Sequence, residues 1–253
     1  IIFTLCFCIV LLDRFDTAAI GYIAPSLMAE WGIAKSALGP VLSAALFGLA
    51  GGALCAGPLA DRFGRKAVLV ASVLVFALAC LASGYSHSLE HLTVWRFITG
   101  LGLGAAMPNA VTLMSEYCPD KRRAMITNAM FCGFPLGAAF GGFLAAWMIP
   151  HFGWRSVSYL GGIAPLLLLV LLVLLLPESV RYMVARGASP QRIGQVLARI
   201  AGPAVANIQQ FVLTEHKPVA QGQRGIGVVL SRSYWIGSVM LWVAYFMGLV
   251  IFY

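Results

Sequence analysis

Charged residues are scarce in this chain of 253 residues. They make up 10% of the sequence, against 60% hydrophobic residues and a mean hydropathy of +0.89. Soluble domains carry about 25% charged residues, so this composition excludes an ordinary soluble domain and indicates a polytopic membrane protein. The net charge of +8 does not indicate nucleic-acid binding, because the basic residues lie between apolar segments and not along one amphipathic face.

Residue sets that build catalytic or metal centres are also missing. Among the four histidines, His87 and His91 stand four residues apart, but no third ligand lies near them in the sequence. No nucleophile and base arrangement is visible, so neither a membrane enzyme nor a bound cofactor or metal is predicted. The cysteines have no metal-ligand spacing and are predicted to be small packing residues in or beside apolar segments: Cys6, Cys8, Cys55, Cys80, Cys118 and Cys132.

Long apolar segments are abundant. A membrane helix needs about 20 apolar residues, and segments of this kind are expected at 1–28, 36–59, 67–84, 89–117, 124–149 and 154–176. A seventh begins near Ser233. We predict an all-α membrane protein with a six-helix N-terminal bundle at 1–176 and a central loop at 177–232. The first helix of a second bundle is expected at 233–253, and an amphipathic helix around Gln191 to Ile200. The chain is expected to be a fragment, because it starts and stops inside apolar runs.

Basic residues are concentrated in alternate loops. Segments 61–66 and 118–123 carry three each and segment 177–232 carries seven, whereas the loops between them carry Lys35 and Arg155. The positive-inside rule then places the basic loops in the cytoplasm. We expect a multi-pass protein of the inner membrane whose central loop is cytoplasmic.

The first apolar segment contains a cluster of three charges, Asp13-Arg14-Phe15-Asp16-Thr17. Each charge at mid-membrane costs about 2.5 to 3.5 kcal/mol, so such a cluster needs partners or a function. A step of about 100° per residue puts Asp13, Asp16 and Thr17 on one helix face and Arg14 on another. Our hypothesis is that two carboxylates line a polar cavity and exchange protons. The alternative is an aspartate pair neutralised by a nearby basic residue for structural reasons.

Arg96 lies about two turns into the fourth apolar segment. A guanidinium stays charged, so Arg96 needs an anion, from this protein or from a substrate, unless it extends to the outer interface. Glycines repeat at four-residue spacing and predict close helix packing: Gly48 and Gly52, Gly100 and Gly104, and Gly133, Gly137 and Gly141.

The string GPLADRFGRK lies between the second and third segments. Its glycines are predicted to serve the bend, and Asp61 is predicted to sit near the N-terminus of the next helix, where the dipole favours an anion. The string resembles the signature loop of the major facilitator superfamily, G-x-L-A-D-R-x-G-R-K. The resemblance implies a cytoplasmic gate between two bundles, formed by the motif residues Gly57, Asp61, Arg62, Gly64, Arg65 and Lys66.

Two further motifs resemble superfamily patterns. Arg96 with Gly100 and Gly102 resembles the fourth-helix pattern R-x-x-x-G-x-G, which implies that Arg96 takes part in proton coupling. The strings SEYCP, KRRA and PES place acidic and basic residues at predicted helix ends. We expect rim salt bridges there, formed among Glu116, Arg122, Arg123, Glu178 and Arg181.

Three longer strings, DRFDTAAIGYIAPSL, MPNAVTLMSEY and LPESVRYMVARG, resemble the aromatic acid:proton symporters of that superfamily, above all the 4-hydroxybenzoate and protocatechuate group. The resemblance implies a symporter that imports aromatic carboxylates with protons by alternating access. In the family pattern D-G-x-D-T, Asp13, Asp16 and Thr17 match, whereas Arg14 replaces the glycine. Either a helix contact has loosened there, or the added charge helps to neutralise the aspartates.

Other functions stay open. The first alternative is another transporter of the same superfamily, for a sugar, a different organic anion or a drug. A drug exporter is disfavoured, because GFPLG at 133–137 lacks the Gly-Pro pair expected of antiporters. A membrane receptor or a half-transporter that no longer transports is the second alternative. The predicted partners are a small aromatic carboxylate, protons and the lipid bilayer, with a monomeric state and no nucleic acid.

Overall fold

The computed structural model describes residues 1–202, 211, 231 and 235–252. It divides into two compact units, Ile1–Phe211 and Val212–Tyr253. In the second unit the structure describes helix α11 (Trp235–Phe252), so the predicted start at Ser233 lies outside the described residues. Half of the predicted central loop, with Lys217, Arg224 and Arg232, also lies outside them. The predicted domain boundaries stay predictions.

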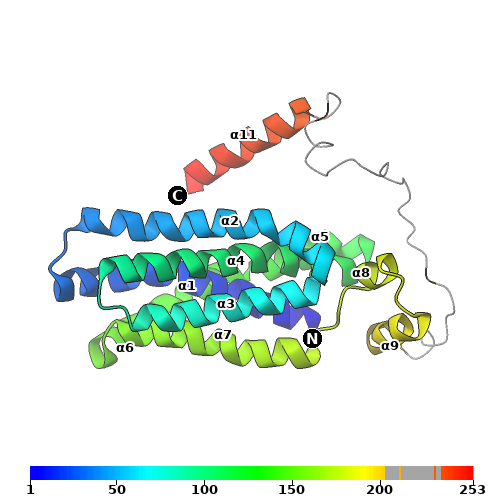
Figure 1. The fold of residues 1–253 in the computed structure, drawn as a ribbon, viewed down its shortest axis with the longest axis horizontal. Coiled ribbons are helices and arrows are strands. Elements are labelled where there is room, and N and C mark those ends of the chain that lie inside the picture. The colour runs from blue at the N-terminus through cyan, green and yellow to red at the C-terminus, as the bar shows by residue number, and fades with distance from the viewer. Residues whose placement is uncertain (203–210, 212–230, 232–234, 253) are drawn as a thin grey trace. The chain divides into compact units, whose positions relative to one another are not determined.

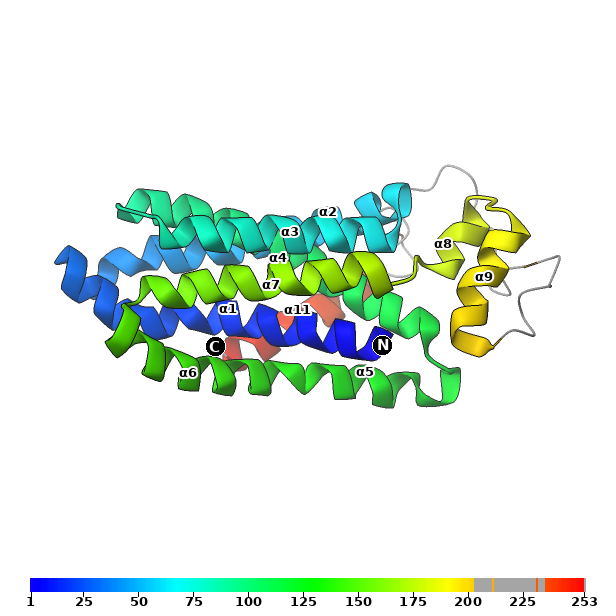
Figure 2. The same ribbon diagram turned by 90° about the horizontal axis from the view of Figure 1, so that it is seen from below.

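The first unit contains a bundle of long helices that run side by side (Figures 1 and 2). They are α1 (Ile2–Trp31), α2 (Gly39–Phe63), α3 (Arg65–Gly84), α4 (Leu89–Tyr117), α5 (Arg123–Phe131) continued by α6 (Gly133–Phe152), and α7 (Arg155–Leu175). Two short 3-10 helices precede α2 and α5, at Lys35–Leu38 and Asp120–Arg122. Beyond α7 come α8 (Val180–Ala185) and α9 (Pro190–Ala201), and α9 is the helix predicted around Gln191 to Ile200.

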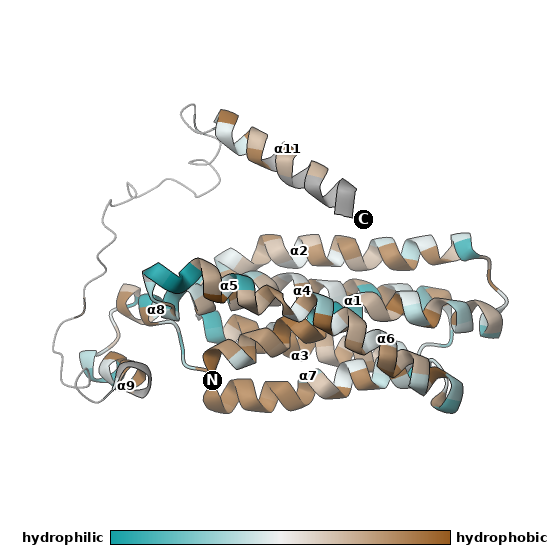
Figure 3. Cartoon of the chain, turned by 180° about the vertical axis from the view of Figure 1, so that it is seen from behind, coloured by the Kyte–Doolittle hydropathy of each residue, from teal (hydrophilic) through white to brown (hydrophobic). Residues whose placement is uncertain are grey.

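Five segments of the described chain are long and apolar enough to cross a membrane: 35–63, 65–84, 89–117, 123–152 and 155–175. Helix α1 has 30 residues, but its central charges interrupt the apolar sequence, so α1 is not among the five. Figure 3 shows that hydrophobic residues dominate the bundle helices, most clearly α7. Large apolar side chains such as Leu54 and Phe143 point outward and are 79% exposed, as expected where a helix meets lipid.

Small residues let α2 and α4 pack closely. A Cβ added to Gly48 or Gly52 would overlap the backbone of α4 at Phe97 or Leu101. The reverse holds for Gly100 and Gly104, whose missing side chains leave room for the α2 carbonyls of Ala45 and Leu49. On another face, Gly137 of α6 packs against the carbonyl of Leu11 in α1. The predicted role of the four-residue glycine spacing is confirmed.

The turn between α2 and α3 differs from the prediction. Helix α2 was expected to end near Leu59, but it continues through Gly57 and Pro58 to Phe63. Gly57 therefore lies inside a helix and does not serve the bend. Gly64 alone makes the turn, with a φ of 99° that residues with side chains rarely adopt.

The interior between α1, α3, α4 and α7 is mostly apolar. Leu69, Val73 and Phe76 of α3 meet Leu103 and Leu113 of α4 there, all almost fully buried. Several polar side chains are also buried in this unit. They are 7% exposed or less and are Asp13, Asp16, Ser72, Ser83, Ser86, Arg96, Thr99, Asn109 and Ser158.

Candidate functional site

A buried ion pair joins α1 to α4. The Nη1 atom of Arg96 donates to both carboxylate oxygens of Asp16, at 3.1 Å to Oδ2 and 3.2 Å to Oδ1. Both side chains are 3% exposed. The anion that Arg96 binds is therefore a carboxylate of this protein. The side chain of Arg96 faces Asp16 inside the bundle and does not extend to the outer interface. Removing one partner of such a pair would leave an uncompensated buried charge.

The other two members of the predicted cluster lie nearby but play different parts. Asp13 is 7% exposed, and no side chain in the described part of the chain donates a hydrogen bond to its carboxylate. The hydroxyl of Thr17 donates to the backbone carbonyl of Asp13 at 2.9 Å, within the same helix. Both aspartates are buried here, and a polar cavity lined by them stays a prediction. Their face of α1 is turned into the packed bundle, where α4 approaches it.

A third side chain contacts Asp16. The Sγ atom of Cys80, on α3, lies 3.0 Å from Oδ1 of Asp16 and 3.4 Å from the backbone carbonyl of Ser158 on α7. Sequence reasoning missed this contact, because it treated Cys80 as one packing cysteine among six. No local signal separates them, since the contact depends on how α1, α3 and α7 are rotated against each other.

Arg96 uses only part of its donor capacity. Its Nε and Nη2 groups are buried and donate to no acceptor among the residues that the structure describes. A buried donor without a partner costs about 1 to 3 kcal/mol. The edge formed by Nε and Nη2 has the geometry with which guanidinium groups bind a carboxylate through two parallel hydrogen bonds. Two donors of Arg96 are thus left over beside Asp16.

Arg14 lies on a different side of α1 from Asp16, as the helical geometry predicts. Its guanidinium is 6.0 Å from the ring centroid of Phe134 at the start of α6. The neighbouring glycines of α6 still pack closely on α1, with Gly133 near Val10. Helices α1 and α6 are therefore in close contact one turn before Arg14, whose guanidinium lies beside an aromatic ring.

The signature loop lies at the end of the bundle where α2 turns into α3. Asp61 and Arg65 form an ion pair at 3.1 Å, with Asp61 73% exposed, so it contributes little to stability. The carbonyl of Arg62 accepts hydrogen bonds from the Tyr182 hydroxyl at 3.1 Å and from Arg186 Nη2 at 2.7 Å. Helix α8 is thereby attached to the turn. A gate contact between two bundles stays a prediction.

Glu178 occupies the N-terminus of α3, where Asp61 was expected. Its Oε1 accepts from the backbone N–H of Lys66 at 3.0 Å and from that of Ser179 at 2.9 Å. A carboxylate at this position stabilises the helix, because the first N–H groups lack partners and carry the positive end of the dipole. The other carboxylate oxygen of Glu178 would lie 2.5 Å from a Cβ atom added to Gly64. The space that this carboxylate occupies is therefore a second reason for a glycine at this position. Asp61 is one turn back, in the last turn of α2.

Two of the predicted rim glutamates take part in hydrogen bonds at this end of the bundle. Glu116 accepts a hydrogen bond from the Ser179 hydroxyl, and Tyr117 donates to the carbonyl of Glu178. The arginines of the prediction occupy nearby helices: Arg122 and Arg123 at the start of α5, and Arg181 in α8. The predicted rim salt bridges stay a prediction.

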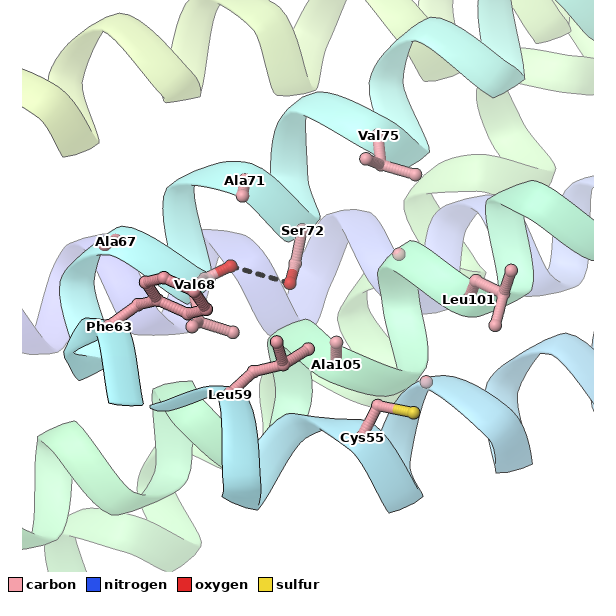
Figure 4. A pocket seen from close by; sticks show the side chains of 12 residues that line it. Cys55, Leu59, Phe63, Ala67, Val68, Ala71, Ser72, Val75, Leu101 and Ala105 are labelled. Atoms are coloured by element: carbon pink, nitrogen blue, oxygen red, sulfur yellow. Dashed lines mark hydrogen bonds between the residues drawn. The ribbon is translucent and has the colours of Figure 1, made fainter. Parts of the chain in front are cut away.

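An apolar groove of about 490 Å³ lies elsewhere, between α2, α3 and α4 (Figure 4). Leu59 and Phe63 of α2 face Val68 and Val75 of α3 across it. The hydroxyl of Ser72 bonds back to the Val68 carbonyl at 2.7 Å, as Figure 4 shows. The residues lining the groove carry no charge, so it does not suit an anion. Among the described residues, no group of three potential ligands is placed to hold a metal.

Comparison with known proteins gives the family. The model of the Major Facilitator Superfamily matches residues 6–253. The chain is 51% identical to the 4-hydroxybenzoate transporter PcaK of Acinetobacter baylyi, over 98% of this chain and 54% of that protein. The corresponding transporter of Pseudomonas aeruginosa is 54% identical over 98% and 55%, and a gallate transporter of Pseudomonas putida 48% over 100% and 56%. These relatives confirm the resemblance seen in the sequence motifs.

The chain spans about half the length of the curated relatives it matches. Among solved structures, it is similar to the inward-open xylose transporter XylE from Escherichia coli, with a TM-score of 0.68 and 23% identity. That match covers 81% of this chain and 53% of XylE, and it shows the fold alone. Fold, apolar helices and family match agree on a multi-pass membrane protein. The chain belongs to the Major Facilitator Superfamily.

Proposed function

We propose that the whole protein imports small aromatic carboxylates, such as 4-hydroxybenzoate or protocatechuate, together with protons by alternating access. The similarity to proteins named 4-hydroxybenzoate and gallate transporters supports the substrate class. The observation that carries the proton coupling is the buried pair of Asp16 and Arg96, whose arginine has two donors left over.

The pair links protons to an anionic substrate through charge balance. A proton on Asp16 removes the negative charge that Arg96 faces, which leaves a buried cation without an anion. The carboxylate of an incoming substrate then restores neutrality by binding Nε and Nη2 of Arg96. Proton and anion are therefore bound together more readily than either alone, which is what symport requires. When the substrate leaves on the inner side, Arg96 again attracts the ionised form of Asp16 and the proton is released.

The other predicted residues have supporting roles in this proposal. Asp13 is a second proton site, three residues before Asp16 on α1. The hydroxyl of Thr17 donates to the backbone carbonyl of Asp13 within the same helix. The loop around Asp61 would reset the outward-facing state by closing against the second bundle. We place the protein in the inner membrane as a monomer, with its basic loops in the cytoplasm and with protons in place of any cofactor.

The test uses the full-length transporter in proteoliposomes. With an inward proton gradient, the wild-type protein is expected to accumulate radiolabelled 4-hydroxybenzoate. Asp16→Asn is expected to lose at least tenfold of this uphill uptake, because the amide cannot take up and release the proton. Glu30→Gln is the matched control, since it changes an acid on the same helix at its exposed end. Asp13→Asn is measured beside them.

Two outcomes would overturn the proposal. If correctly inserted Asp13→Asn and Asp16→Asn variants both accumulate substrate against its gradient, the aspartates do not couple protons to transport. If the wild-type vesicles take up a sugar but no benzoate-type acid, the substrate class is wrong and another superfamily porter is favoured. Binding without uptake would indicate the receptor alternative.

A further inference from the structure

We propose that Cys80 is a positioning residue for Asp16, and that its thiol moves its hydrogen bond between Asp16 and the Ser158 carbonyl as Asp16 gains and loses a proton. The inference rests on the proposed function, because it assigns the titrating group to Asp16. It concerns a side chain on α3, the helix that supplies neither member of the ion pair.

The geometry brings three helices to one point. The Sγ atom of Cys80 is 3.0 Å from Oδ1 of Asp16 on α1 and 3.4 Å from the carbonyl of Ser158 on α7. Cys80 is 1% exposed, so no solvent competes for its proton. A thiol has a single hydrogen, and it can donate fully to only one of these two acceptors at a time. The two contacts are therefore alternatives that the thiol hydrogen can exchange by rotation about the Cβ–Sγ bond.

The charge on Asp16 decides which acceptor the thiol prefers. Hydrogen bonds to an ionised acceptor are roughly twice as strong as neutral ones, so the thiol donates to Oδ1 while Asp16 is a carboxylate. Once Asp16 is protonated, its oxygens become weaker acceptors and the Ser158 carbonyl is the better partner. The thiol keeps its own proton throughout, and no covalent bond to sulfur forms or breaks.

Arg96 and Cys80 together hold the ionised carboxylate of Asp16. Within the described chain, the Asp16 carboxylate accepts hydrogen bonds from two side chains, Arg96 and Cys80. When a substrate carboxylate binds Arg96 in the proposed cycle, Asp16 is protonated and the thiol donates to the Ser158 carbonyl. When the proton leaves, the thiol returns to Oδ1 and helps to orient the carboxylate toward Arg96 again.

The surroundings of Cys80 distinguish it from an ordinary packing cysteine. Gly161 of α7 has no side chain where Cys80 needs room, and a Cβ there would be 2.9 Å from Sγ. Cys6 of α1 is also fully buried, but it lies in the apolar core cluster and makes no hydrogen bond through its side chain in the described chain. Cys6 is therefore a matched control for the loss of a buried thiol.

The first experiment measures uptake of radiolabelled 4-hydroxybenzoate by the full-length transporter across a range of external pH. Cys80→Ala removes a donor that favours the ionised carboxylate, so Asp16 stays protonated to higher pH. We expect the pH of half-maximal uptake to rise by roughly 0.5 to 1 unit. Cys80→Ser keeps a donor and is expected to restore the wild-type profile, and Cys6→Ala to leave it unchanged.

A second measurement is independent of transport. The S–H stretching band in the infrared spectrum of the purified full-length protein reports what the thiol donates to. The part of the band that Cys80→Ala removes is expected to shift with pH in the wild type and to be independent of pH in Asp16→Ala. Gly161→Ala, which crowds the thiol without removing it, is expected to alter the same band and to raise the pH of half-maximal uptake.

The two measurements separate failure of this inference from failure of the proposed function. If uptake depends on Asp16 but Cys80→Ala and Cys6→Ala give the same pH profile, Cys80 has no positioning role. The same conclusion follows if the S–H band assigned to Cys80 depends on pH in the same way in the wild type and in Asp16→Ala. If the band responds to Asp16 while uptake needs no proton gradient, the contact is real but the coupling mechanism is wrong, and the inference falls with it.

Discussion

Glu30, in the last turn of α1, is held by two donors from the start of α7. The indole N–H of Trp154 donates to Oε2 at 2.6 Å, and Arg155 Nη1 donates to Oε1 at 2.7 Å. Both contacts lower the pKa of Glu30, with the Trp154 hydrogen bond as the larger cause. Glu30 lies beyond the predicted span, which ends at residue 28, and its side chain is 40% exposed.

The lowered pKa of Glu30 predicts a pH-dependent stability. Since the pKa is lower in the folded state, the ionised carboxylate stabilises the fold above its unfolded pKa. That contribution is lost as the pH falls through the folded pKa. Glu30→Gln is expected to lower the thermal unfolding midpoint of the full-length protein at neutral pH but not at strongly acidic pH. Because the pair is exposed, its contribution stays below about 1 kcal/mol.

Salt provides the control for this prediction. A pair at the surface is screened, so the difference between Glu30→Gln and the wild type is expected to shrink in 1 M salt, where the Debye length is about 3 Å. If the unfolding midpoints of the wild type and Glu30→Gln differ by the same amount at neutral and at acidic pH, the carboxylate contributes by packing and not by charge.

At the candidate site, the sequence predicted which residues need partners but not which partners they find. An arginine deep in an apolar helix must meet an anion, so the need of Arg96 followed from the sequence alone. That it meets Asp16, and that Cys80 joins them, depends on the rotation of α1, α3 and α4 about their axes. Helical periodicity places residues on a face, but it does not say which helix that face meets.

At the helix ends, too, the sequence predicted only part of what the structure shows. The turn after α2 was predicted too early, because Gly57 and Pro58 suggested an end that the following residues override. The fifth segment was predicted as one helix, and the structure divides it at Cys132 into α5 and α6. Carboxylate caps from distant segments, such as Glu178 on α3, are invisible in the local sequence. Bilayer thickness fixes the length of a helix better than local residues fix its ends.

The two glycines of the signature loop give a prediction at the scale of this turn. Gly64 has a φ of 99°, and a side chain there would press on Glu178. Gly64→Ala is therefore expected to destabilise the full-length protein by about 1 to 3 kcal/mol. Gly57→Ala adds a methyl group where nothing lies within 4 Å, inside a helix that alanine favours. It is expected to be neutral or slightly stabilising in the same thermal unfolding assay.

The comparison between the two variants decides the interpretation of the turn. If Gly57→Ala destabilises the protein as much as Gly64→Ala, then both glycines serve the bend, as the sequence first suggested, and α2 ends earlier than the structure shows. If neither does, the contact of Glu178 with the turn contributes little.

For the molecule as a whole, the order and number of the first helices could be predicted because the membrane imposes them. A hydrocarbon layer of about 30 Å demands apolar segments of nearly constant length, and basic loops mark alternate ends. The helices of the bundle follow this pattern, with α1 as the span that tolerates charges by burying them against α4. The packing arrangement needed more information, which the family resemblance supplied.

The orientation of the bundle is the prediction that belongs to this scale. Ser36 and Ser189 are exposed at opposite ends of it, Ser36 before α2 and Ser189 before α9. The end that carries Arg62, Arg65 and α8 also carries Ser189, so the positive-inside rule places Ser189 in the cytoplasm. In intact cells, a membrane-impermeant maleimide is expected to label Ser36→Cys and not Ser189→Cys, in a full-length background whose native cysteines do not react. After permeabilisation, both are expected to react. Labelling of Ser189→Cys alone in intact cells would reverse the orientation, and with it the direction of the proposed proton-driven import.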